Sequence, residues 1–122
     1  MKVVFNLIMK TLQEANIAPV YALGAHKGSI DGRMIVVKPD NATQLMNYST
    51  TIQYFDILCY GRTASEAVDL ADKVQEAMRS LQFTVMPTYT TQTPYWDSTT
   101  HGWQISCVYR NLIKNKGGIT NA

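Results

Sequence analysis

The sequence is poor in the residue types that carry out chemistry. Its 122 residues include two cysteines and two histidines, and only 16% of them are charged. The histidines, His26 and His101, stand far apart, and a metal site joining them to Cys59 or Cys107 needs a helical or hairpin spacing that is absent. Residues 24–29 contain two glycines but have neither the spacing nor the following helix of a phosphate-binding loop. We therefore expect no metal and no cofactor.

The cysteines and the short hydrophobic runs exclude further classes of protein. Two cysteines do not make a disulfide framework and no secretory signal precedes them, so a reduced, cytosolic origin is the simplest interpretation. Both stand in predicted strands among aromatic residues, which is typical of small core residues and not of reactive nucleophiles. No apolar run approaches the roughly 20 residues of a transmembrane helix. We expect a protein that is not an enzyme and does not contact a membrane.

The balance of charge argues against strong binding to nucleic acid. The net charge is +2 and the isoelectric point is about 8.6. Strong electrostatic binding requires a concentrated basic face. The sequence has no basic run longer than the one formed by Lys114 and Lys116 near the C-terminus. Its tyrosines and tryptophans lack interleaved arginine or lysine, so we interpret them as core and subunit contacts and not as base-stacking residues.

The chain does contain a well-marked strand and helix, in residues 51–83. A long β-rich run leads directly into a helix in which Thr63 is placed as the N-cap and Glu66 completes a capping box. Apolar residues fill one half of this helix and polar residues the other, and Asp69 and Lys73 form an i,i+4 pair. The preceding strand is largely apolar on both faces, with Asp56 on one of them. It therefore predicts a central strand covered on two sides, or covered on one side by a partner subunit.

The remaining elements predict a single α+β domain with two helices packed on one face of a mostly antiparallel sheet of about four to five strands. A first helix is expected at residues 3–16, followed by strands at 19–23, 33–38 and 50–60, a β-rich run at 83–92 that Pro87 interrupts, and a last strand at 103–114. Residues 40–49 are polar and predict a loop, and residues 93–102 predict a hairpin connection. The domain spans residues 1–113, and residues 114–122 form a flexible tail.

This order of motifs resembles a known family. A long strand ends in Tyr60-Gly-Arg-Thr63, an amphipathic helix SEAVDLADKVQEAM follows, and a closing hairpin ends in GWQISCVYR. Together with the N-terminal helix and the length, this resembles the small tail terminator proteins of long-tailed bacteriophages, also labelled minor capsid or tail completion proteins. The resemblance spans nearly the whole chain, and its motifs are patterns of fold.

The resemblance implies an architectural function. Proteins of this family assemble as a hexameric ring on the head-proximal end of the tail tube, stop tube polymerisation, and present a surface to the head connector. The implied partners are further copies of the chain, the tail tube protein and the connector protein. The implied location is the head–tail junction of the virion, after assembly in the host cytoplasm.

A ring needs two different contact patches on each subunit, and the sequence offers candidate residues for them. The expected subunit or partner contacts are Met46, Tyr48, Tyr54, Tyr60, Tyr95 and Trp96. Weak, sequence-independent contact with DNA in the lumen is expected from Arg33, Lys38 and Arg110. Tyr95 and Trp96 have an equal alternative, which is to fold back onto their own sheet. Two other functions stay open: a stopper or head-completion protein of the same virion, and an unrelated α+β ligand-binding module.

Overall fold

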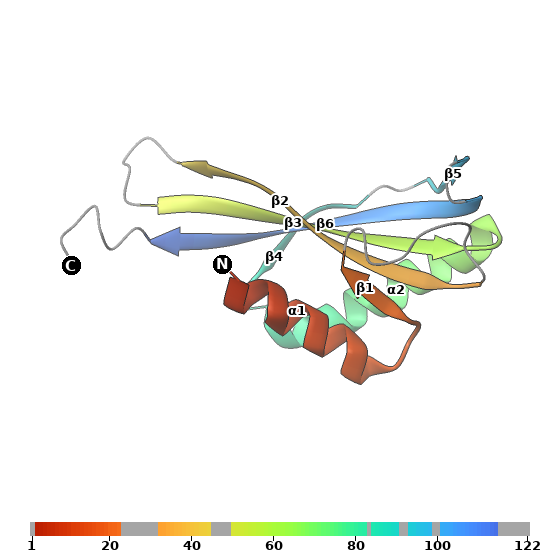
Figure 1. Cartoon of the computed structure of the whole chain (residues 1–122), viewed down its shortest axis with the longest axis horizontal. Helices are drawn as coiled ribbons and strands as arrows, with labels where there is room; N and C mark the ends of the chain where they lie inside the picture. The colour runs from red at the N-terminus through yellow and green to blue at the C-terminus, as the bar shows by residue number, and fades with distance from the viewer. Residues whose placement is uncertain are drawn as a thin grey trace.

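The computed structural model describes residues 2–22, 32–44, 50–82, 84–90, 93–98 and 101–114. The elements are α1 (Lys2–Ala15), β1 (Val20–Ala22), β2 (Met34–Gln44), β3 (Thr50–Gly61), α2 (Ala64–Met78), a 3₁₀ turn η1 (Arg79–Leu81), β4 (Met86–Thr90), β5 (Tyr95–Asp97) and β6 (Gly102–Lys114). Figure 1 shows α1 and α2 next to each other on one side of the sheet. The predicted α+β fold with both helices on one face is confirmed.

The sheet is built around its two longest strands, β3 and β6. They pair antiparallel along almost their full length, from Thr50 opposite Lys114 to Gly61 opposite Trp103. The strand order is β1-β2-β3-β6-β4, and β5 pairs with the start of β6. Only β1 pairs in parallel, with β2. In Figure 1 the outer ends of β2, β3 and β6 project beyond α1, and we call these ends (residues 42–44, 50–53 and 111–114) the arm.

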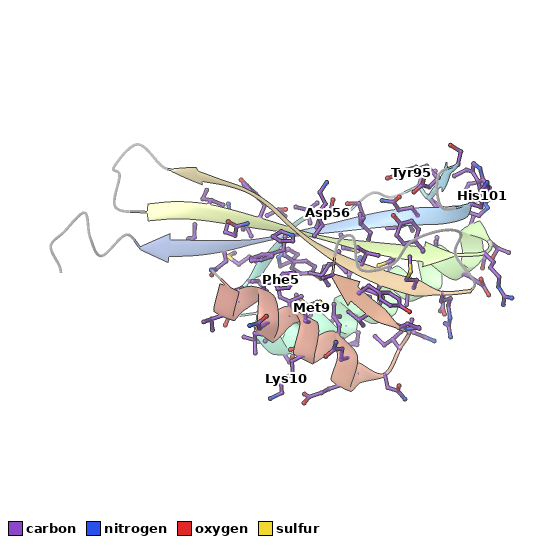
Figure 2. The ribbon with its side chains drawn as sticks, in the orientation of Figure 1. Phe5, Met9, Lys10, Asp56, Tyr95 and His101 are labelled. Atoms are coloured by element: carbon purple, nitrogen blue, oxygen red, sulfur yellow. The ribbon has the colours of Figure 1, made fainter. Side chains whose placement is uncertain are left out.

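The core lies between the helices and one face of β2, β3 and β6. Phe55, Ile57 and Cys59 of β3 have no exposed surface. They pack with Ile8 and Leu12 of α1, Leu70 and Val74 of α2, and Ile105 and Cys107 of β6. Figure 2 shows Phe5 and Met9 on the side of α1 that faces the sheet and Lys10 on the opposite side. Burying this apolar surface supplies most of the favourable free energy of folding.

The turn from β3 into α2 is fixed by local hydrogen bonds. The Thr63 hydroxyl accepts a hydrogen bond from the Glu66 backbone N–H at 3.1 Å, so Thr63 is the N-cap, as predicted. The Glu66 carboxylate reaches back to the N–H of Arg62, at 2.8 Å, and not to that of Thr63. A Cβ on Gly61 would lie 2.7 Å from the backbone nitrogen of Ala67. Only glycine therefore fits where the strand passes under the first turn of α2.

Two sequence predictions for the loops were wrong. Residues 40–44 are not a loop: β2 continues to Gln44 across a register shift between Pro39 and Ala42. The predicted hairpin connection contains a short sixth strand, β5, paired with β6. Both segments lack a clear periodicity, and they become strands because a neighbouring strand supplies backbone partners. Of the predicted tail, Lys114 belongs to β6, and residues 115–122 lie outside the described part of the chain.

Neither helix of the described segments is long and apolar enough to span a bilayer.

Candidate interaction surface

The face of the sheet that points away from the helices has no covering layer among the described elements, and we call it the open face. Side chains alternate between the two faces along each strand, so every second residue of β3 lies on the open face. The residues of β2 and β6 that pair with these β3 residues lie there too, and so does Met86 of β4. Its described residues are Met34, Val36 and Lys38 of β2, Ile52, Tyr54, Asp56, Leu58 and Tyr60 of β3, Met86 of β4, and Gln104, Ser106, Val108, Arg110 and Leu112 of β6. Figure 2 shows Asp56 on this side of the sheet.

One end of the open face is closed within the chain. Tyr60, Met34 and Val36 are 5–7% exposed and form a second, smaller cluster against Tyr21 and Leu58. Removal of the Tyr60 ring from water, and then the nearby Asp97 carboxylate, raise the pKa of Tyr60 to about 12. Tyr60 was expected at a subunit contact. It instead serves this cluster and offers little surface to a partner.

The centre of the open face combines half-buried apolar and charged groups. The Ser106 hydroxyl donates a hydrogen bond to the Asp56 carboxylate across the β3–β6 pair. Tyr54 and Arg110, which are directly opposite each other, are both half-buried. The Nε of Arg110 is buried and has no hydrogen-bond partner within the described residues. Because a buried donor without an acceptor is costly, an added acceptor here would be stabilising.

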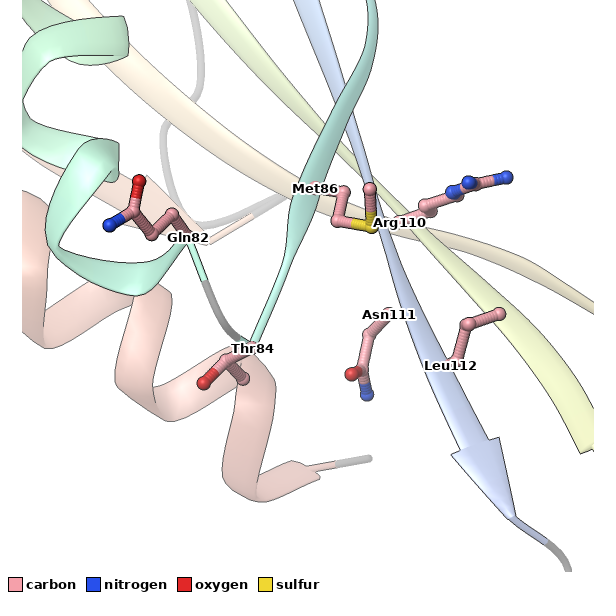
Figure 3. Close-up of a pocket in the computed structure, with 6 residues that line it drawn as sticks. All are labelled: Gln82, Thr84, Met86, Arg110, Asn111 and Leu112. Carbon is pink, nitrogen blue, oxygen red and sulfur yellow. The ribbon is translucent and has the colours of Figure 1, made fainter.

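The far end of the open face is the most exposed and carries apolar side chains. Leu112 of β6 is 53% exposed and Met86 of β4 is 47% exposed. A hollow of about 570 Å³ lies beside them, lined by Gln82, Thr84, Met86, Arg110, Asn111 and Leu112. Figure 3 shows Arg110 and Leu112 on one side of β6 and Asn111 on the other, toward Thr84. The hollow therefore follows the outer edge of β6.

The two aromatic residues of β5 lie on opposite faces of the sheet. Tyr95 is 47% exposed on the open face, opposite Gln104. Burial, and then the Asp97 carboxylate, raise the pKa of Tyr95. Trp96 is 48% exposed on the helix side and meets the Trp103 ring edge-to-face, with centroids 5.9 Å apart. Each residue thus folds back on β6 with part of its ring and leaves about half of its surface exposed.

The structure separates the other candidate residues. Met46 and Tyr48 lie outside the described residues. Arg33 pairs with Asp69 of α2 at 3.6 Å, so its charge lies on the helix side, away from the open face. Lys38 and Arg110 both lie on the open face. The three basic residues expected near DNA therefore do not form one basic patch.

Cys59 and Cys107 are buried thiols on neighbouring strands. A hydrogen bond with Cys107, and then burial, raise the pKa of the Cys59 thiol, which disfavours the nucleophilic thiolate. No group of three or more potential metal ligands occurs in the segments that the structure describes. A hollow of about 300 Å³ between α2 and β4, lined partly by Gln75, Arg79 and Tyr109, is at the lower limit of ligand-site size.

No family model matches this chain, and no curated protein matches its sequence. The surface must therefore be interpreted from its own residues. Sequence reasoning missed Met86, Leu112 and the Asp56–Ser106 hydrogen bond. One signal was present, because Val108 breaks the polar side of the last strand and shares that side with Leu112. Two apolar residues on a supposedly polar side indicate a face that is not made only for water.

Proposed function

We propose that this protein is a structural virion protein of a long-tailed bacteriophage or prophage. In this proposal it forms a ring that terminates the tail tube and joins it to the head connector. The observation that carries the proposal is a sheet whose two helices cover one face while the other keeps half-buried apolar side chains. The order of motifs along the chain, which resembles the tail terminators, supports the same function.

A ring of identical subunits accounts for the distribution of this surface. A cyclic head-to-tail contact joins two different patches on each subunit. The exposed aromatic residues of β5 and the exposed Leu112 and Met86 lie near opposite ends of β6, so one chain offers two separate patches. A specific contact buries about 1,000 Å² or more in total. Single side chains do not supply that area, and a neighbouring subunit lying over part of the open face does.

The proposed partners follow from the position at the tail end. One side of the ring stacks on the tail tube protein and the other meets the head connector protein. DNA passes through the lumen, where weak contact with phosphates by Lys38 and Arg110 fits the small net charge of +2. The proposed location is the head–tail junction of the virion.

Measurement of tail tube length tests the proposal. The chain is added to tail tube protein of the same virus during polymerisation, and tube length and end structure are recorded by electron microscopy. We expect shorter tubes with a ring on one end and a mass in solution that rises when tube protein is present. The matched control is the variant Leu112→Asp, which places a charge at the exposed far end of the open face.

Two results would contradict the proposal. If tubes grow to the same length and carry no added density, the chain does not terminate them. If it binds only the connector complex, it is another head–tail joining protein, such as a stopper. Native mass spectrometry addresses the remaining alternative, because a small molecule retained by a single chain would indicate a ligand-binding module.

A further inference from the structure

The outer edges of the sheet differ in how well they are protected against pairing with another strand. Exposed edges are normally blunted by shortness, proline, charge or a bulge, since unpaired backbone groups recruit other strands. β1 forms one edge and is only three residues long. β4 forms the other, and it contains Pro87 and a register shift between Pro87 and Tyr89. Both therefore carry ordinary protection.

The arm has two edges whose end residues carry neither proline nor charge, although the β2 edge follows a register shift after Pro39 and the β6 edge ends at Lys114. β1 pairs with β2 only as far as Val37, and β4 pairs with β6 only as far as Arg110. Beyond those residues, β2 and β6 have β3 as their one partner strand among the described residues. Residues 42–44 of β2, after the bulge, and 111–113 of β6 include no charged residue and no proline. Alternate residues of each strand therefore direct backbone groups to an open edge.

These two edges lie at the same level of the arm. Thr43 and Leu112 are both paired with Ile52, and Gln44 and Ile113 are both paired with Thr51. β2 and β6 run in the same direction, because each is antiparallel to β3. A second copy placed beside the first in the same orientation thus brings its residues 42–44 alongside residues 111–113 with no shift along the strand.

We propose that residues 111–113 of β6 in one copy pair with residues 42–44 of β2 in the next copy, as a parallel ladder that continues the sheet between subunits. The partner is therefore a second copy of this chain. Joining opposite edges of one arm makes a head-to-tail contact, which closes into a ring when the sheet twist supplies the rotation. This inference rests on the proposed ring and adds a backbone contact to the side-chain contacts proposed for it.

The surroundings of the β6 edge fit an incoming strand. The hollow of about 570 Å³ runs along this edge, so the added strand has room beside Asn111 and Leu112. Leu112 is 53% exposed and lies level with Thr43 of the added strand, a β-branched residue that would cover part of it. Parallel pairing of three residues is weak by itself. It therefore sets the register of the joint, while the side-chain contacts of the adjoining faces add most of the buried area.

Cysteine cross-linking between copies tests the pairing. The double variant Thr43→Cys with Leu112→Cys is oxidised and analysed on a non-reducing denaturing gel. A disulfide forms only between directly neighbouring strands, so it cannot join the two thiols of one chain, which β3 separates. We expect a ladder of covalent multimers longer than dimers, because each copy links at both edges. Each single variant alone should stay unlinked, and an equal mixture of the two should stop at dimers. The wild type controls for Cys59 and Cys107, which are buried.

The possible outcomes distinguish failure of the proposed strand pairing from failure of the proposed ring. The mass of the untreated wild type in solution is measured in parallel. If the wild type forms rings but Leu112→Cys alone links into dimers, β6 pairs with β6 and the proposed joint is wrong while the ring stands. If neither multimers nor cross-links form at any concentration, with or without tail tube protein, both the joint and the ring are rejected. If the first double variant does not fold, Gln44→Cys with Ile113→Cys, level with Thr51, makes the same test.

Discussion

The two faces of β3 differ in what covers them, although their residues alternate along one strand. On the helix face, Phe55, Ile57 and Cys59 are completely buried by the chain's own helices. On the open face, Tyr54 and Leu58 are apolar too, yet they stay half-buried. The first face is closed by local connection to α2 and by α1. The second face shows that the folded chain has more apolar strand surface than its two helices cover.

The largest expected effect comes from an alanine substitution on the helix face. Phe55→Ala should lower the free energy of unfolding by about 3–5 kcal/mol, since it empties a fully packed site. Tyr54→Ala, the adjacent aromatic residue on the open face, should cost at most about 2 kcal/mol, because part of its ring is already in water. Urea denaturation of both variants measures the difference. Equal losses would mean that the open face is core and not a contact surface.

The next largest effect is expected at Gly61, in the turn that leads from β3 into α2. Gly61→Ala should destabilise the fold by about 1–3 kcal/mol, because the new Cβ would lie 2.7 Å from both the Ala67 backbone nitrogen and the Glu66 Cβ. The strand end and the first turn of α2 would then have to move apart. Ala64→Ser, in the same turn, is the matched control and should change stability by less than about 1 kcal/mol. If Gly61→Ala has the same thermal midpoint as the wild type, the turn can accommodate the added Cβ without loss of stability.

The sequence predicts those features of the two faces that arise from residues close together in the chain. The cap at Thr63, the apolar half of α2 and the Asp69–Lys73 ion pair at 3.3 Å arise from spacing within one helix, and all were predictable. The end of α1 was also predictable, because asparagine often ends helices in the left-handed conformation. Asn16 adopts this conformation, with φ of 53°.

The missed features depend on partners distant in the sequence. Residues 42–44 look like a loop until β3 supplies their hydrogen bonds. Tyr60 looks as available as Tyr54, and only the approach of Met34, Val36 and Tyr21 buries it. The candidate surface was therefore predicted in kind, as a second apolar face of β3, but not in extent. The apolar far end of this surface, with Leu112 and Met86, could not be predicted, because it depends on where each strand of the sheet ends.

A smaller effect is expected at β5, where Trp96 contacts its own sheet and keeps about half of its surface exposed. The edge-to-face contact of Trp96 with Trp103 should contribute about 0.5–1.5 kcal/mol. A double-mutant cycle of Trp96→Ala and Trp103→Ala measures this coupling in the unfolding free energy. If Trp96 also contacts a neighbouring subunit, Trp96→Ala should lower the mass of the assembled protein far more than its thermal midpoint. If the assembled mass and the thermal midpoint fall in proportion, the Trp96 side chain serves only its own sheet.

The smallest effect is a pH dependence at the start of α2. The hydrogen bond from the Arg62 N–H, together with the Arg62 charge, holds the pKa of Glu66 below its ordinary value of 4.5. A carboxylate with a lowered pKa stabilises the fold above its unfolded pKa, and this stabilisation is lost as the pH falls through its folded pKa. The difference in stability between the wild type and Glu66→Gln should therefore shrink below about pH 4.5. Because Glu66 closes the turn that brings α2 onto the helix face, a constant difference at all pH values would show that its carboxylate charge contributes nothing to that closure.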